Sequence, residues 1–107
     1  KLVISEARNF PDLAQFYLAR IERLPYKSTD GWQIDGFLVK PINFDPAKKY
    51  PMILSIHGGP AGQYGTDWFH EAQVYASKGW AVFFCNPRGS TGYGQAAIRS
   101  PGAGRIC

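Results

Sequence analysis

Residues 51–60 read Pro-Met-Ile-Leu-Ser-Ile-His-Gly-Gly-Pro, an apolar run that ends in a histidine, paired glycines and a proline. The run Met52–His57 predicts a strand buried on both faces, as a parallel sheet flanked by helices requires. The glycines after it carry no Cβ, so a ligand can closely approach the backbone N–H groups there. The stretch therefore predicts a strand of an α/β sheet with an accessible loop at its carboxyl end.

A second strand and a second glycine-rich loop follow farther along the chain. Trp80–Cys85 predicts another buried strand, and residues 86–94 read Asn-Pro-Arg-Gly-Ser-Thr-Gly-Tyr-Gly. Between the two strands, Asp67–Lys78 predicts a helix, since the aspartate can cap its first turn and the glycine that follows can end it. We expect the two strands to be adjacent and parallel, forming one right-handed βαβ unit.

The part of the chain before this unit predicts an antiparallel hairpin. Tyr26–Thr29 and Gln33–Val39 are extended runs separated by Asp-Gly-Trp. Asp-Gly between such runs is a strong turn signal, because glycine readily adopts a positive φ. Farther upstream, the apolar spacing of Leu13–Leu24 predicts a short helix or turn, although Gln15–Leu18 also suits a short strand.

Composition and charge exclude several classes of function. The net charge is +4, with 12 basic and 8 acidic residues spread along the chain, so we expect no nucleic-acid partner. We also expect no membrane span, because the sequence contains no apolar run of about 18 residues. His, Cys and carboxylate residues lack metal-ligand spacing, and the glycines fit no phosphate-binding pattern, so we expect no metal and no cofactor.

The two glycine-rich loops, in this order and at this distance, resemble the catalytic domain of prolyl oligopeptidase-type serine peptidases. The acylaminoacyl-peptidase and dipeptidyl-peptidase-like branch is the most similar, and the resemblance covers roughly residues 26–95. It implies an α/β fold, an incomplete α/β-hydrolase fold in which an opening antiparallel hairpin precedes a βαβ unit of a mostly parallel sheet.

The resemblance also implies three segments. Residues 1–24 would be the end of a preceding propeller-like domain with its linker, and residues 25–95 the N-terminal part of the peptidase domain. Residues 96–107 do not match the family. They read as a tail translated in a shifted frame or after a truncation, with a natural flexible tail as the alternative.

Site residues follow from the same resemblance. The backbone N–H of Gly59 would point at the developing oxyanion of an acyl-transfer transition state, with His57 and Gly58 completing the oxyanion loop. Arg88 and Tyr93, on the second loop, are predicted to bind substrate. Two structural alternatives stay open: His57 can brace the Gly-Gly turn through a side-chain hydrogen bond, and Arg88 can hold its own loop.

No catalytic triad is expected in these residues. A nucleophile elbow places glycine two residues before and two after the serine, and Ser90 comes nearest to this frame. Arg88 occupies the first glycine position, however, and Ser90 lies one strand too early, so we do not expect it to be the nucleophile. His57 precedes Ser90, whereas the base of these folds comes last.

The sequence therefore predicts a piece of a serine-type peptidase that hydrolyses short peptides, inactive by itself. Its partners would be a short peptide substrate and the missing remainder of the catalytic domain, and the expected compartment is the cytoplasm. A carboxylesterase or lipase-like hydrolase is one alternative, and a non-catalytic remnant or interaction module is another. Alone, the chain is expected to dissolve poorly, because Trp80–Cys85 would expose an unpaired apolar edge.

Overall fold

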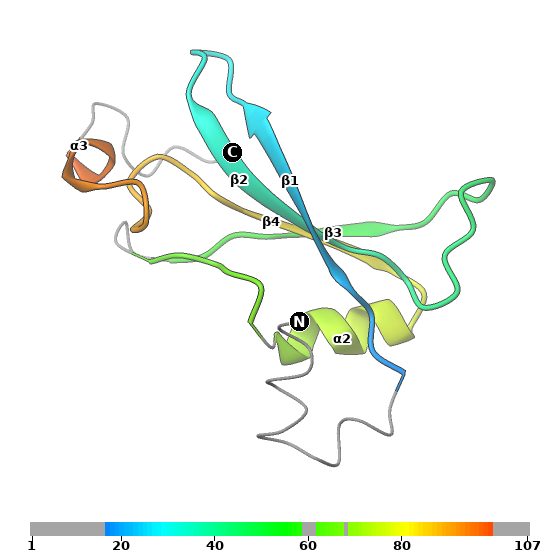
Figure 1. The fold of residues 1–107 in the computed structure, drawn as a ribbon. Helices are drawn as coiled ribbons and strands as arrows, with labels where there is room; N and C mark the ends of the chain where they lie inside the picture. Colours follow the sequence, from blue (N-terminus) through cyan, green and yellow to red (C-terminus); the bar gives the residue numbers. More distant parts are fainter. Residues whose placement is uncertain (1–16, 59–61, 68, 100–107) are drawn as a thin grey trace.

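A computed structural model describes residues 17–58, 62–67 and 69–99. It contains one four-stranded sheet in the order β1-β2-β4-β3 (Figure 1). β1 pairs antiparallel with β2, β2 antiparallel with β4, and β4 parallel with β3. The elements are β1 Ile21–Lys27, β2 Gln33–Val39, β3 Met52–Ser55, α2 His70–Ser77, β4 Ala81–Asn86 and α3 Gln95–Ile98.

The predicted hairpin is confirmed as β1 and β2, which pair from Ile21 opposite Val39 to Lys27 opposite Gln33. Gly31 has φ of +83° in the turn, the conformation for which glycine is suited. The prediction of a helix or turn over Leu13–Leu24 is wrong wherever the structure describes this segment. Residues 17–20 form no helix, turn or strand, and residues 21–24 belong to β1, where pairing with β2 outweighs the helical spacing of the apolar residues. The part of that prediction before residue 17 lies outside the described residues.

The βαβ unit is confirmed, since β3 and β4 are parallel neighbours and α2 lies between them in the chain. Gly79 follows the helix with φ of +85°, and its N–H donates to the carbonyl of Ala76 at 3.1 Å. The predicted start at Asp67 is wrong, because α2 begins at His70 and Phe69 occupies the N-cap without a side-chain hydrogen bond. An aspartate two residues before the N-cap is not at the position from which a side chain caps the first turn.

Two expectations about strand environment are also wrong. β3 is an edge strand of the sheet, and Met52 and Leu54 are 62% and 46% exposed, so this strand is not buried on both faces. β4 has no free edge, because β2 pairs with the side opposite β3. Among the described residues, the unpaired edges of the sheet, which favour association between chains, are therefore those of β1 and β3.

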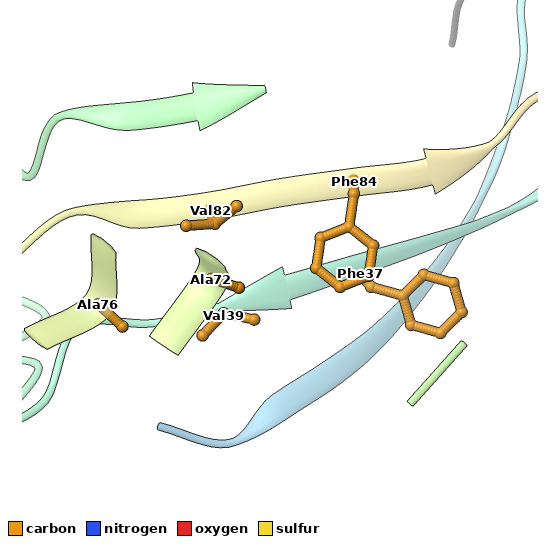
Figure 2. Packing of buried hydrophobic residues seen from close by; sticks show 6 residues of the cluster. All are labelled: Phe37, Val39, Ala72, Ala76, Val82 and Phe84. Carbon is orange, nitrogen blue, oxygen red and sulfur yellow. The ribbon is translucent and has the colours of Figure 1, made fainter. Parts of the chain in front are cut away.

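The core lies between α2 and one face of the sheet (Figure 2). Ala72 and Ala76 of α2 are buried over β2 and β4, where their small side chains let the helix come close. Phe37 and Phe84 are opposite each other in the β2–β4 register, and their rings stack with centroids 5.4 Å apart. The remaining members of the buried cluster are Val39 and Val82.

Substitution of Gly36 by alanine should destabilise the sheet by about 1–3 kcal/mol, the usual cost of overpacking. A Cβ at this position would lie 2.9 Å from the carbonyl oxygen of Leu24 and 2.9 Å from the Phe83 ring. The measurement is urea unfolding of Gly36→Ala beside Gly58→Ala, whose Cβ would have no neighbour within 4 Å. Equal stability of the two variants would contradict the close approach of β1 to β2 at Gly36.

Candidate functional site

The loops that follow β3 and β4 meet at the carboxyl ends of these two parallel strands. The N–H of Thr91 donates to the carbonyl of Gly62 at 3.1 Å, and its hydroxyl donates to Oε1 of Gln63 at 2.9 Å. The carboxyl end of parallel strands is where α/β proteins bind ligands. Gly59, the predicted oxyanion donor, lies outside the described residues.

His57 connects the two loops through its imidazole. Nδ1 is 3.0 Å from the carbonyl oxygen of Gly58, and Nε2 is 2.9 Å from Oγ of Ser90. The edge of the ring packs on Tyr64, with centroids 5.3 Å apart. The histidine thus makes the bracing contact considered from the sequence, and it also bonds to the second loop.

Ser90 is completely buried and is held in a turn of the second loop. Its N–H donates to the carbonyl of Pro87 at 3.0 Å, and Gly89 before it has φ of +98°. With 0% exposure and its hydroxyl bonded to His57, Ser90 is closed to a substrate carbonyl in this structure. In this structure Ser90 therefore connects the two loops through hydrogen bonds.

Arg88 ties the second loop to the hairpin turn. Its guanidinium forms an ion pair with Asp30 and lies over the Trp32 ring, 5.1 Å from the centroid. The pKa of Asp30 is below its usual value, first because of the hydrogen bond from Ser28, then that from the Trp32 N–H, and further because of Arg88. Arg88 thus has contacts through which it can hold its own loop, as the structural alternative required. Substrate contact by Arg88 stays a prediction.

Tyr93 extends the hydrogen bonding between β2 and β4. Its hydroxyl accepts the N–H of Asp35 at 2.7 Å and donates to the carbonyl of Asn86 at 3.0 Å. The same residue lines an open polar cavity of about 270 Å³ next to the second loop. The other residues that line this cavity include Arg23, Asp35, Gln63, Asn86 and Thr91. The cavity gives Tyr93 a possible place for substrate contact, and substrate binding by this residue stays a prediction.

Tyr93→Phe should lower the free energy of unfolding by about 1–3 kcal/mol, because the Asp35 N–H and the Asn86 carbonyl lose a partner. Burial raises the pKa of Tyr93 above its usual value, so the folded protein keeps this proton after the unfolded chain has lost it. That difference makes stability fall as pH rises above about 10, and Tyr93→Phe should make the fall shallower.

The measurement for this variant is urea unfolding at neutral pH and at a series of alkaline pH values. Tyr50→Phe is the matched control at neutral pH, because its hydroxyl accepts one N–H, that of Asp45, within a surface loop. A loss no larger than that of Tyr50→Phe, or an unchanged alkaline slope, would contradict the role given to Tyr93.

The sequence interpretation missed Asn86, the last residue of β4, as an organiser of the site. Its buried side chain accepts the N–H of Tyr64 at 2.6 Å and donates to the carbonyl of the same residue at 2.8 Å. This pair of bonds holds the loop after β3 against the end of β4. The only signal in the sequence was an amide residue directly after an apolar run.

Two kinds of feature are absent from the described residues. No helix there is both long enough and apolar enough to span a membrane. Across the same parts of the chain, no three His, Cys, Asp or Glu side chains gather closely enough to hold a metal ion.

Comparison with known sequences gives relatives that are peptidases by name. The uncharacterized peptidase YuxL of Bacillus subtilis is 47% identical over 79 residues, which are 74% of this chain and 12% of that protein. Dipeptidyl-peptidase 5 of Schizosaccharomyces pombe is 43% identical over 76 residues, 69% of this chain and 11% of that protein. The chain thus spans about an eighth of the length of these relatives, and no protein-family model matches it.

Solved structures of similar fold include two structures of acylaminoacyl peptidase. One, in complex with Z-Gly-Gly-Phe-chloromethyl ketone, matches with a TM-score of 0.74 at 35% identity, over 83% of this chain and 14% of that one. The enzyme of Pyrococcus horikoshii matches with a TM-score of 0.73 at 35% identity, over the same shares. Both likenesses cover most of this chain and a small part of the solved structures.

Proposed function

Because the chain is a member of the prolyl oligopeptidase-type serine peptidases, we propose that it contributes the oxyanion loop of an enzyme that hydrolyses short peptides. The fold is that of the opening part of an α/β-hydrolase domain. In this proposal the N–H of Gly59 donates to the oxyanion of the acyl-transfer transition state, and the rest of the catalytic domain supplies the Ser-Asp-His triad.

The observation that carries the proposal is the junction of the two loops at the carboxyl ends of β3 and β4. His57 bonds to Gly58 in one loop and to Ser90 in the other, so the turn before Gly59 is held against the second loop. An oxyanion donor is effective only when it is fixed in place before the reaction. The bonds of His57 supply such a fixed support directly beside the proposed donor.

The two alternatives differ in how much supports them. The relatives named above are peptidases, which favours a peptide substrate over the ester substrate of a carboxylesterase or lipase. A non-catalytic remnant would need no preorganised loop, so it predicts that the oxyanion loop fails when placed in a working enzyme.

The test is a chimera in which residues 26–95 replace the matching stretch of the Pyrococcus horikoshii acylaminoacyl peptidase. If the loop functions, the chimera should hydrolyse an N-acylated aminoacyl anilide, because the host supplies the triad and the transferred residues supply the oxyanion donor. A folded chimera that binds the anilide without hydrolysing it would contradict the proposal. The unmodified host enzyme is the control.

The 107-residue chain itself is expected to show no turnover of an activated ester or an aminoacyl anilide. The reason is that acyl transfer needs an activated nucleophile and a base in addition to an oxyanion loop. Ser90 is buried and lacks the nucleophile-elbow frame. Turnover that disappears in Ser90→Ala would show that this serine is a nucleophile and would overturn the assignment.

A further inference from the structure

The cavity beside Tyr93 has walls that are bonded to one another. Its volume is about 270 Å³, and its lining comes from the hairpin, the loop after β3, the end of β4 and the second loop. The Tyr93 hydroxyl accepts the N–H of Asp35 in the hairpin, and the Thr91 hydroxyl donates to Gln63 in the loop after β3. The cavity is therefore preformed, and a ligand would bind without the entropy cost of ordering its walls.

The charges of the cavity cancel. Of the described residues that line it, only Arg23 and Asp35 are charged, and they form an ion pair with 2.6 Å between Nη2 and Oδ1. A ligand with a single negative or positive charge would meet one attractive and one repulsive group there. The cavity thus favours a ligand without net charge.

Polar groups of the cavity keep unused hydrogen-bonding capacity. Nε and Nη2 of Arg23 both donate to Oδ1 of Asp35, and no donor in the described part of the chain reaches Oδ2, although this side chain is only 21% exposed. Gln63 accepts from Thr91 through Oε1, and its NH₂ group makes no hydrogen bond with any described residue. Asp35 therefore offers an acceptor, while Arg23 and Gln63 offer donors.

A peptide unit matches these groups, because it has one N–H that donates, one C=O that accepts and no net charge. We propose that the cavity binds the main chain of a peptide, with Oδ2 of Asp35 accepting a peptide N–H and the side chains of Arg23 and Gln63 donating to peptide carbonyls. The ligand is the part of the peptide substrate that lies away from the cleaved bond. This identification of the ligand rests on the proposed function, whereas the binding of peptide groups does not.

The place of the cavity in the fold supports a substrate as the ligand. Tyr64 lines the cavity, and its ring packs on that of His57 at the end of β3, with centroids 5.3 Å apart. An extended peptide advances about 3.3 Å per residue, so a chain bound in the cavity reaches the loop after β3 within a few residues. Binding energy from such a remote part of a substrate is available to longer peptides and not to shorter ones.

The first experiment titrates the ¹⁵N-labelled 107-residue chain with N-acetyl-glycylglycine N-methylamide, a neutral compound made of peptide groups. The main-chain amide signals of Gln63, Thr91 and Gly92 should shift saturably, with a millimolar Kd that suits a few hydrogen bonds. Sodium acetate and ethylammonium chloride, which carry one charge each on the ligand, should not shift these signals saturably. Saturation by either ion without saturation by the neutral compound overturns the proposal.

A double substitution tests the polar groups. Arg23→Ala/Asp35→Ala removes a donor and an acceptor together and leaves the cavity neutral, so Kd should rise about tenfold, as expected for the loss of about two hydrogen bonds. The matched control is Glu22→Ala/Lys40→Ala, which deletes an ion pair of 2.8 Å whose members do not line the cavity. Equal Kd values in the two double variants overturn the proposal.

Arg23→Ala alone tests the charge balance, and its side chain is 62% exposed, so this variant should fold. The carboxylate of Asp35 then lacks its counter-charge, and ethylammonium should begin to shift the amide signals of Thr91 and Gly92 saturably. A variant that binds ethylammonium no better than the unmodified chain contradicts the role given to the ion pair.

The last experiment measures kinetics in a chimera that begins at residue 21 and so contains all of β1. It compares an N-acylated tetrapeptide anilide with the N-acylated aminoacyl anilide. Arg23→Ala/Asp35→Ala should lower kcat/KM for the longer substrate about tenfold relative to the shorter one, through KM. Glu22→Ala/Lys40→Ala should leave this ratio as it is in the parent chimera.

The outcomes separate the cavity from the proposed function. An inactive chimera, together with saturable binding of the neutral compound by the chain, would contradict the proposed function and leave the peptide-binding cavity intact. An active chimera with the same ratio in both double variants would contradict the substrate as the ligand and assign the cavity to a segment of protein chain.

Discussion

Insertion of one glycine between Gly58 and Gly59 of the chimera is expected to lower kcat about 10²–10³-fold with little change in KM. The added residue separates the proposed donor from Gly58, whose carbonyl oxygen bonds to His57. An interaction made only in the transition state affects kcat and kcat/KM equally when it is lost. The measurement is steady-state hydrolysis of the N-acylated aminoacyl anilide by the two chimeras.

The matched control for this insertion is a glycine added between Ala47 and Lys48, in the surface loop that precedes β3. The N–H of Ala47 and the N–H of Lys48 both bond to Asp45, so the insertion disturbs a local turn far along the chain from the site. Its kcat should match that of the parent chimera. A rise in KM that accounts for the whole loss at Gly58–Gly59 would mean that the loop binds substrate and does not stabilise the transition state.

Phe84→Ala is expected to lower the free energy of unfolding by about 3–5 kcal/mol, the usual cost of removing a buried aromatic ring. Phe84 is 1% exposed, and its ring centroid lies 5.4 Å from that of Phe37, 4.8 Å from that of Tyr64 and 5.3 Å from that of Phe69. A domain has only about 5–15 kcal/mol of net stability, so this substitution should remove a large share of it.

This variant is tested by urea unfolding beside Phe44→Ala, whose side chain is 41% exposed in the loop before β3. Tyr64 packs on both Phe84 and His57. The space left by the missing Phe84 ring should therefore also loosen the packing of the His57 imidazole. Stability losses of similar size in the two variants would contradict the central place of Phe84 in the core.

Elements with strong local signals were predictable from the sequence. The Asp30-Gly31 turn located the hairpin, and Gly79 located the end of α2, because both glycines occupy positions with positive φ. The β1 strand was predicted only in part, since its first residues owe their conformation to pairing with β2. The edge position of β3 depends on which strands pair, and an apolar run does not encode that.

For the candidate site, the sequence predicted that the two strands would be adjacent and parallel, and parallel strands present their carboxyl ends at one edge of the sheet. It did not predict the contacts that hold them together. The pairing of Asp30 with Arg88 and that of Tyr64 with Asn86 join residues 58 and 22 positions apart. Such contacts between side chains and distant partners leave no periodic pattern in a sequence.

The most direct test of the account is a crystal structure of the chimera after reaction with Z-Gly-Gly-Phe-chloromethyl ketone, the ligand of a structurally similar acylaminoacyl peptidase. Attack by the host serine converts the ketone oxygen into a mimic of the oxyanion. The account predicts that the Gly59 nitrogen lies about 2.7–3.1 Å from this oxygen, with its N–H directed at it. A Gly59 N–H turned away from the oxygen, with another group donating in its place, would contradict the account.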